Sequence, residues 1–275
     1  MPTNFQVGLR MTKPLPMALV KNLTIIIQPL ISIAGLFLLW ELAVYALSIP
    51  GYILPAPSAI WRGLAELGMA SLLGHIGATL TTVLLGFSLS VLVSLPLAIA
   101  ITASPAISRV IYPLLILTQS IPKVALAPIL IIMLGTNALP RVLVSFLVAF
   151  FPLVVSTAAG LLAAPPELIE LGRSYRASKL KELIRIRLPF AIPFIFSGLK
   201  VASALSVVGA VVAEFVAANQ GLGYLITTSM AFFQTPAAWG AVIILAFMGM
   251  GFFGLIALIE KVFFPWANPN PMAGE

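Results

Sequence analysis

Apolar residues are concentrated in six long runs along this chain, and more polar segments separate them. The runs cover residues 23–48, 78–103, 110–134, 139–163, 190–218 and 237–263. An α-helix rises about 1.5 Å per residue, so each run is long enough to cross a hydrocarbon core of about 30 Å. The pattern predicts an all-α, polytopic membrane protein with six transmembrane helices, arranged as a first span and a five-span core over residues 78–264.

The third run differs from the others because prolines interrupt it. Pro113, Pro122 and Pro128 lie within it, together with Lys123. Proline lacks a backbone donor and frees the carbonyl four residues earlier, and in a membrane such a carbonyl must be satisfied by neighbouring helices or by a cavity. We therefore expect the third span to be a broken helix.

Two segments between the runs have helical periodicity of their own. Residues 49–77 form an outer loop, in which Ala59–Leu73 predicts a short helix at the membrane interface. Residues 165–189, named the 165–189 loop below, predict two short amphipathic helices, the second at Ser178–Ile186 and stopped by Pro189. Such helices either lie on anionic lipid or fit the groove of a partner protein, and composition leaves both uses open.

Composition restricts the chemistry of the chain. Hydrophobic residues make up 61% of its 275 residues and charged residues 8%, whereas a soluble domain has about 45–50% and about 25%. The sequence has no Cys, no Asp and a single His, His75, which excludes disulfides and the usual metal sites. It has no phosphate-binding loop and no aromatic-interleaved basic patch, so we expect neither an enzyme nor a nucleic-acid-binding protein.

The basic residues are distributed unevenly between the predicted loops. Most of them lie before the first span, between spans two and three, in the 165–189 loop or after the last span, whereas the opposite loops hold only Arg62 and Arg141. The positive-inside rule therefore places the tails, residues 1–22 and 265–275, and the 165–189 loop in the cytoplasm.

Glu41, Lys123, Lys200 and Glu214 all fall within the apolar runs. An unpaired charge at the bilayer centre costs at least about 2.5–3.5 kcal/mol, so such residues usually pair or line a wet cavity. Pro122 and Lys123 lie at the break of the third run, and Glu214 lies near the outer end of the fifth. We predict that these three residues line a translocation pathway. Lys123 and Glu214 either form an ion pair there or pack separately, and Glu41 and Lys200 are expected near the interfaces.

The 165–189 loop resembles the cytoplasmic loop motif of permease subunits from binding-protein-dependent ATP-binding-cassette (ABC) importers. The family pattern is Glu-Ala-Ala, three residues, Gly, nine residues and Ile-x-Leu-Pro. Four residues match it at the correct spacing, namely Glu170, Ile186, Leu188 and Pro189. Leu171 and Gly172 replace the two alanines, and Arg176 stands where the family has Gly. Arg176 in place of Gly weakens the prediction of a tight left-handed turn at this position, because Arg can continue a right-handed helix.

The resemblance extends over most of the chain beyond the first span. Residues 119–130 are similar to the family's proline-broken third span, and residues 221–226 are similar to the turn after the fifth. Permeases of nitrate, sulfonate, taurine and thiamine-precursor importers are the most similar. The resemblance assigns ATPase coupling to eight residues, which are Glu170, Leu171, Gly172, Tyr175, Arg176, Ile186, Leu188 and Pro189.

The resemblance also implies the partners of the chain. It implies a homodimer of permeases in the bacterial inner membrane, two ATPase subunits docked on the 165–189 loop and an external solute-binding protein, with membrane lipid around the spans. ATP and Mg would be bound by the ATPase and not by this chain. The implied solute is a small anion, such as nitrate, a sulfonate or taurine, or a vitamin precursor.

Two other classes of function remain possible from the residues alone. An ion-coupled secondary transporter needs carboxylates inside the membrane, and Glu41 and Glu214 are the only candidates among those weighed. A membrane scaffold without transport needs none. A secondary transporter does not explain the spacing from Glu170 to Pro189, and binding of a labelled solute to the assembled complex would separate a scaffold from a permease.

Overall fold

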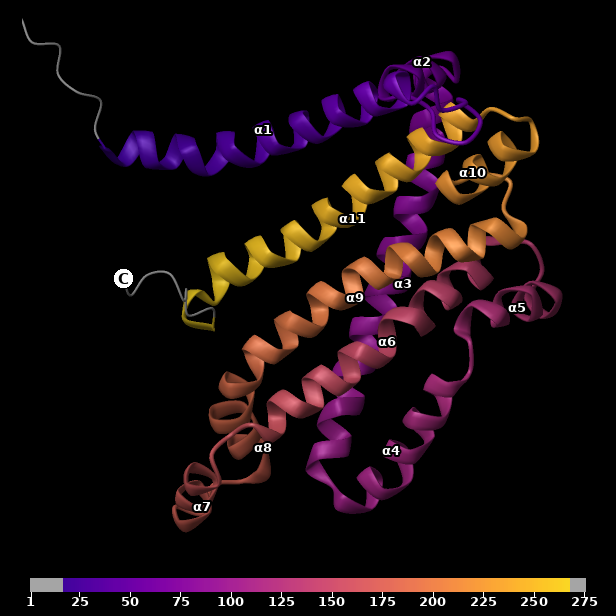
Figure 1. The fold of residues 1–275 in the computed structure, drawn as a ribbon. Helices are drawn as coiled ribbons and strands as arrows, with labels where there is room; N and C mark the ends of the chain where they lie inside the picture. The colour runs from indigo at the N-terminus through magenta and orange to yellow at the C-terminus, as the bar shows by residue number, and fades with distance from the viewer. Residues whose placement is uncertain (1–16, 268–275) are drawn as a thin grey trace, which may run out of the picture. The chain divides into compact units, whose positions relative to one another are not determined.

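The structure, a computed structural model (Figure 1), describes residues 17–267, with side chains from residue 31 onward except at residues 105, 112, 119 and 217. Residues 1–16 of the predicted N-terminal tail and 268–275 of the C-terminal tail lie outside the described residues. The elements between residues 17 and 267 are all helical, so the predicted all-α class is confirmed. The chain forms two units, residues 1–59 and 60–275.

The first unit consists mainly of α1, which spans Met17–Ala46 and contains most of the predicted first span. Glu41 of α1 accepts hydrogen bonds from the backbone nitrogen of Ser58 at 3.0 Å and from its hydroxyl at 2.7 Å. Ser58 lies in the first turn of α2, which begins at Pro57. A carboxylate is favourable at this positive helix end, so Glu41 serves as a capping residue.

The helix predicted at residues 59–73 is wrong in its extent. α2 ends at Glu66, and α3 begins at Met69 and continues to Ala103. Gly68 separates the two helices with a φ of 76°, a conformation that interrupts a right-handed helix and that Gly adopts without strain. The last predicted residues of the interfacial helix therefore form the first turn of α3.

The break expected in the third span is present. α4 (Pro105–Ser120) ends before Pro122, and a short 3₁₀ turn, η1 (Lys123–Ala125), leads into α5 (Leu126–Leu134). The two halves are bent by 74° relative to each other. Pro122 lies at the break, where it has no backbone donor to continue the hydrogen-bond ladder, whereas Pro113 lies inside α4 and Pro128 inside α5 without ending either helix.

The remaining elements follow in chain order. They are α6 (Ala138–Leu162), α7 (Pro166–Ser174), α8 (Lys179–Glu182), the π-helical turn η2 (Leu183–Arg187), α9 (Leu188–Ala217), α10 (Leu222–Ala231), α11 (Thr235–Phe263) and η3 (Pro265–Ala267). Within the second unit, α7 and α8 lie at one end of α9 and α10 lies at the other (Figure 1).

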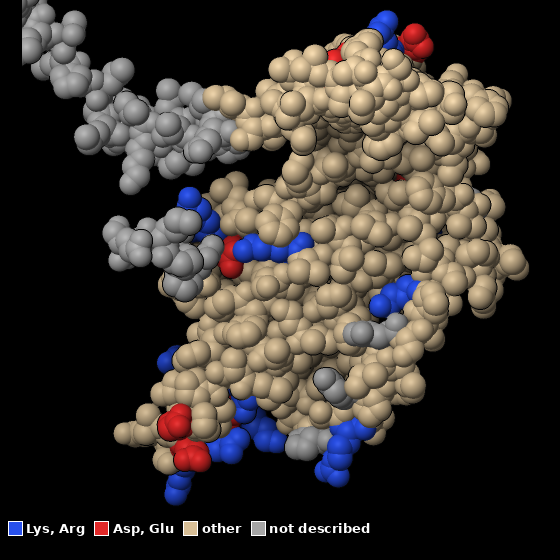
Figure 2. Space-filling view, in the orientation of Figure 1, with Lys and Arg blue, Asp and Glu red and all other residues tan. Residues whose placement is uncertain are grey.

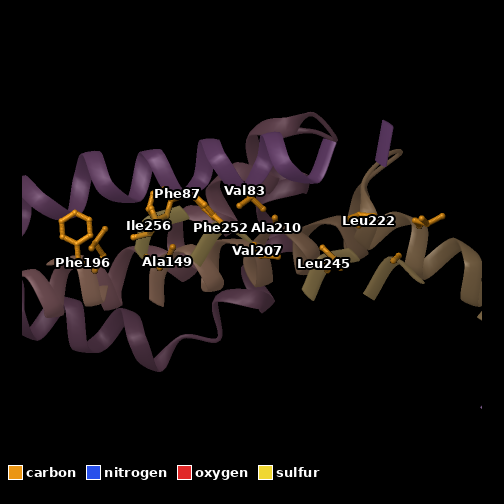
Figure 3. Close-up of a cluster of buried hydrophobic side chains, with 14 residues drawn as sticks. Val83, Phe87, Ala149, Phe196, Val207, Ala210, Leu222, Leu245, Phe252 and Ile256 are labelled. Atoms are coloured by element: carbon orange, nitrogen blue, oxygen red, sulfur yellow. The ribbon is translucent and has the colours of Figure 1, made fainter. Parts of the chain in front are cut away.

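Buried apolar side chains from α3, α6, α9, α10 and α11 form the main core of the second unit, and Figure 3 shows several of them. α6 packs against both α3 and α9. Ser145 of α6 lies against Gly86 of α3 and Gly209 of α9, and a Cβ at Gly209 would lie 2.8 Å from the Ser145 Cα. Small residues at these positions allow the three backbones to approach closely.

Four helices in the described part of the chain are long and apolar enough to cross a membrane, and α4 with α5 gives a fifth if the bent pair forms one span. The described side chains of α1, from Ile31 to Ala46, form a shorter apolar helix. A multi-pass membrane protein is therefore established, and the sixth span remains a prediction.

Candidate functional site

α7 begins at Pro166, as predicted for the first helix of the 165–189 loop, and ends in a left-handed turn at Arg176, whose φ is 55°. The Arg176 nitrogen donates to the Arg173 carbonyl at 2.8 Å, and the Ala177 nitrogen donates to the Gly172 carbonyl at 3.0 Å. These are the paired hydrogen bonds of a Schellman motif. The left-handed turn that Arg in place of Gly made less expected is therefore present, although this conformation costs an L-residue about 1–2 kcal/mol.

The second helix of the loop starts as predicted and ends differently. α8, η2 and α9 form one continuous helix over Lys179–Val216, so Pro189 does not stop it. In η2 the Leu188 nitrogen donates to the Leu183 carbonyl, five residues back. This widened turn precedes the proline ring, which in a regular α-helix would clash with the carbonyl four residues earlier.

Several motif residues gather in one groove where α7 meets the continuous helix. A Cβ at Gly172 would lie 2.8 Å from Ile186 Cδ1, so the missing side chain allows the two helices to approach. The groove has a volume of about 310 Å³ and is lined by Leu168, Leu171, Gly172, Tyr175, Arg185, Ile186 and Phe190. Tyr175 is 82% exposed and Leu171 is 54% exposed. An apolar surface of this kind suits a protein partner.

The other predicted coupling residues flank this groove. Glu170 is exposed in α7, its backbone carbonyl accepts from the Ser174 hydroxyl at 3.0 Å, and its carboxylate has no hydrogen bond in the described structure. Leu188 and Pro189 are partly buried in the first turn of α9. The structure therefore leaves the Glu170 carboxylate available at the surface and places Leu188 and Pro189 at the entry to a long span.

A charge cluster in the same loop was not predicted. Glu182 is 8% exposed and accepts from Arg187 at 2.8 Å and from Arg173 at 3.3 Å. Arg187 also donates to the Leu161 carbonyl at the end of α6, at 3.2 Å. The cluster ties α7, α8 and α6 together. The alternation of acids and bases in the sequence signals ion pairs in general, but it does not reveal which acid is buried.

The far end of α9 carries a second buried carboxylate, Glu214, which is 1% exposed. It accepts from the Thr79 hydroxyl at 3.0 Å and from the Gly223 nitrogen at 2.7 Å. The Thr79 oxygen in turn accepts from the Leu222 nitrogen at 2.7 Å, and His75 Nδ1 accepts from the Gly221 nitrogen at 3.1 Å. These side chains fix the first turn of α10 against α3 and α9.

The turn between α9 and α10, named the Gly221 turn below, depends on two glycines. Gly221 has a φ of 132° and a ψ of 163°, and a Cβ there would overlap the Glu214 carboxylate. A Cβ at Gly223 would lie 2.7 Å from the Val211 carbonyl oxygen. Arg141 of α6 donates to the Gln220 carbonyl at 3.3 Å. The glycines are therefore required by close approach to a buried acid.

Lys123 and Glu214 do not form an ion pair in the described structure. The Lys123 ammonium lies 5.8 Å from the centroid of the Phe151 ring, next to Pro122 at the break of the third span. Lys200, in contrast, pairs with Glu260 of α11 at 2.5 Å. Glu260 lies close to the end of the last apolar run, a place where a charged residue usually lies at the membrane interface. The sequence therefore gives no sign that Glu260 is the buried partner of Lys200.

Comparison with known proteins gives a consistent result. The model of the family described as "Binding-protein-dependent transport system inner membrane component" matches residues 90–267. The formylaminopyrimidine transport permease protein ThiX of Halalkalibacterium halodurans is 32% identical over 240 residues, which cover 87% of this chain and 96% of ThiX. The riboflavin transport system permease protein RibX of Chloroflexus aurantiacus is 32% identical, over 84% of this chain and 87% of RibX.

Two further similarities are more distant. The taurine transport system permease protein TauC of Escherichia coli is 28% identical, over 82% of this chain and 84% of TauC. Among solved structures, a chain of the MetNI methionine ABC transporter in an inward-facing conformation matches with a TM-score of 0.58 and 17% identity, over 70% of this chain and 97% of that chain. The structural match supports the same fold.

Proposed function

Since the chain belongs to the family of inner membrane components of binding-protein-dependent transport systems, we propose that two copies of it form a solute pathway driven by separate ATPase subunits. The family predicted from the loop motif is thereby confirmed. The chain is a multi-pass permease subunit of an ABC importer in the inner membrane, and it is not itself an enzyme. ATP and Mg would be bound by the partner ATPase.

The observation that carries the coupling proposal is the groove on the 165–189 loop. Its exposed apolar residues, among them Leu171 and Tyr175, offer a docking surface, and the Glu170 carboxylate beside it offers a charged contact. Ile186 of this groove belongs to the continuous helix over Lys179–Val216. A push on the groove would therefore reach the fifth span through Leu188 and Pro189 without crossing a flexible joint.

The proposed pathway uses the break of the third span and the far end of α9. Pro122 and Lys123 place a bend and a cation at the break, and Glu214 holds the Gly221 turn at the outer end of the fifth span. Movement of α9 would displace this turn. ATP-driven closure of the ATPase subunits would in this way open the pathway. Six spans and cytoplasmic termini complete the proposed topology, with residues 23–48 as the first span, 49–77 as the outer loop and 78–264 as the core.

The names of the relatives support a narrow range of solutes. They include transporters of formylaminopyrimidine, riboflavin, aliphatic sulfonates and taurine. We propose that this permease carries a small anion or a vitamin precursor, delivered by an external solute-binding protein. Family membership leaves no observation that favours an ion-coupled transporter or a non-transporting scaffold.

The topology and the docking role can be tested with single cysteines, because the natural chain has none. A cysteine at exposed Ser174 should react with a membrane-impermeant thiol reagent only from the cytoplasmic side, and poorly when the ATPase is bound. The matched control is Asn219→Cys, in the Gly221 turn, which should react only from outside and be unaffected by the ATPase. Labelling of Ser174→Cys from outside in intact cells would refute the orientation, and equal labelling with and without the ATPase would refute docking on this loop.

A further inference from the structure

A second cavity, of about 550 Å³, lies between the end of α3 and the α7–α8 pair. Ala103 and Thr102 form its wall on α3, and Leu180 and Leu183 form its apolar wall on α8 and η2. It shares no lining residue with the groove proposed for ATPase docking. It therefore lies on a different face of the same helix pair.

More basic than acidic residues line this cavity. Arg173, Lys179 and Arg187 line it together with a single acid, Glu182. Glu182 is already shared between the two arginines, and Lys179 is exposed and has no ion pair in the described part of the chain. Figure 2 shows Lys and Arg side chains gathered at this end of the unit, with fewer of them over the long helices. The cavity thus has an excess of positive charge.

The position of the cavity matters as much as its charge. α3 is an apolar helix that spans the membrane, and Ala103 is its last residue. The cavity is therefore level with the end of a span, where lipid headgroups meet water. Basic pockets between spans at this level are typical binding sites for anionic lipid headgroups.

We propose that this cavity binds the phosphate of an anionic phospholipid, with Lys179 and the two arginines around the headgroup and the upper acyl chain against Leu180 and Leu183. A free inorganic anion could use the cations but would gain nothing from the two leucines or from the size of the cavity. A bound lipid would hold the α7–α8 pair against α3. The proposal depends on the membrane location of the chain and not on the docking role of the 165–189 loop.

Lipid retention by the purified transporter tests the role of Lys179 in the proposed site. The wild type should retain phosphatidylglycerol in preference to phosphatidylcholine, measured by native mass spectrometry after titration of each lipid. Lys179→Gln should weaken phosphatidylglycerol binding about fivefold, because one Lys near an anionic membrane surface contributes about that factor to the affinity. Lys181→Gln is the matched control, because Lys181 is exposed on the same short helix and does not line the cavity. Equal retention of the two lipids, or an equal loss in both variants, would overturn the proposal.

A thiol introduced into the cavity tests the place of binding. Ala103→Cys, the only cysteine in such a chain, should be modified more slowly in nanodiscs of phosphatidylglycerol than in nanodiscs of phosphatidylcholine. Protection by inorganic phosphate to the same extent would identify a free anion as the occupant and contradict the lipid. Protection by the ATPase in lipid-free detergent would make the cavity part of the docking surface and also contradict it. Neither result would affect the labelling expected at Ser174→Cys, so this proposal and the docking role fail separately.

Discussion

The polar side chains at the two ends of α9 lie in opposite environments. At the Gly221 turn, Glu214 is buried and its hydrogen bonds come from Thr79 and Gly223 of the same chain. At the 165–189 loop, Tyr175 is 82% exposed and the Glu170 carboxylate projects from the surface. The difference separates a junction that the chain completes by itself from a surface that needs a partner. Mutations should therefore act on folding at the first end and on assembly at the second.

The largest effect is expected for Gly221→Ala. Its φ of 132° and ψ of 163° lie in a region open essentially to Gly alone, and the new Cβ would overlap the Glu214 carboxylate. Backbone strain and overpacking together should destabilise the subunit by about 3 kcal/mol or more. The measurement is the unfolding midpoint of the detergent-purified subunit. The control is Gly249→Ala in α11, where a Cβ meets nothing within 4 Å and helix propensity predicts no loss. Equal stability of the two variants would mean that the Gly221 turn is not fixed by close contact.

A smaller effect, and one on assembly, is expected for Glu170→Ala. Loss of a hydrogen bond to a charged group costs about 1.5–3 kcal/mol, which corresponds to roughly 10- to 150-fold weaker docking of the ATPase. Membrane abundance should stay near that of the wild type, because Glu170 is exposed and outside the spans. The assay is retention of the ATPase on pull-down together with solute uptake.

Glu167→Ala is the matched control for that change. Glu167 lies in the first turn of α7, where it interacts with the helix dipole, a contribution of about 0.3–1 kcal/mol. Glu167→Ala should therefore weaken docking of the ATPase far less than Glu170→Ala does. If both variants keep the ATPase equally well, Glu170 has no docking role and the loop end is not held by this charge.

Whether the sequence predicts a structural feature correctly depends on how far apart along the chain the residues that form it lie. The apolar runs, the proline break near Lys123 and the start of α7 follow from residues within a few turns, and they are predicted correctly. The Thr79–Glu214 bond joins residues 135 positions apart, and the His75–Gly221 bond joins residues 146 apart. Hydrophobic periodicity contains no information on such pairs.

The errors in the 165–189 loop have a different origin. Local rules predicted that Pro189 would end a helix, and they made a positive φ at Arg176 less expected. In the structure a π-helical turn precedes Pro189, and paired backbone hydrogen bonds hold Arg176 at a φ of 55°. Both are cases in which surrounding packing and hydrogen bonds override a residue's intrinsic preference. The family Gly at position 176 was a usable signal, because it marks a left-handed position regardless of the residue that occupies it.

A double mutant would sharpen the account of the Gly221 turn. Glu214→Ala alone leaves the Thr79 hydroxyl and the Gly223 nitrogen without their acceptor, so it should also destabilise the subunit. It also removes the carboxylate that a Cβ at position 221 would meet. The combined variant should therefore be less destabilised than the sum of the two single changes, by about 1.5 kcal/mol. Additive losses would assign the strain at Gly221 to its backbone conformation alone.

The smallest effect is expected for Arg176→Gly, and its sign is the informative part. Relief of a left-handed conformation should return about 1–2 kcal/mol, and the added freedom of Gly in the unfolded chain should remove about 0.4–1 kcal/mol of this. The centre of these ranges gives a net gain in stability of about 0.8 kcal/mol, measured as a higher unfolding midpoint of the detergent-purified subunit. Arg176→Ala is the control, because it removes the same charge and keeps the Cβ that causes the strain. If Arg176→Gly is no more stable than Arg176→Ala, the left-handed turn is not strained.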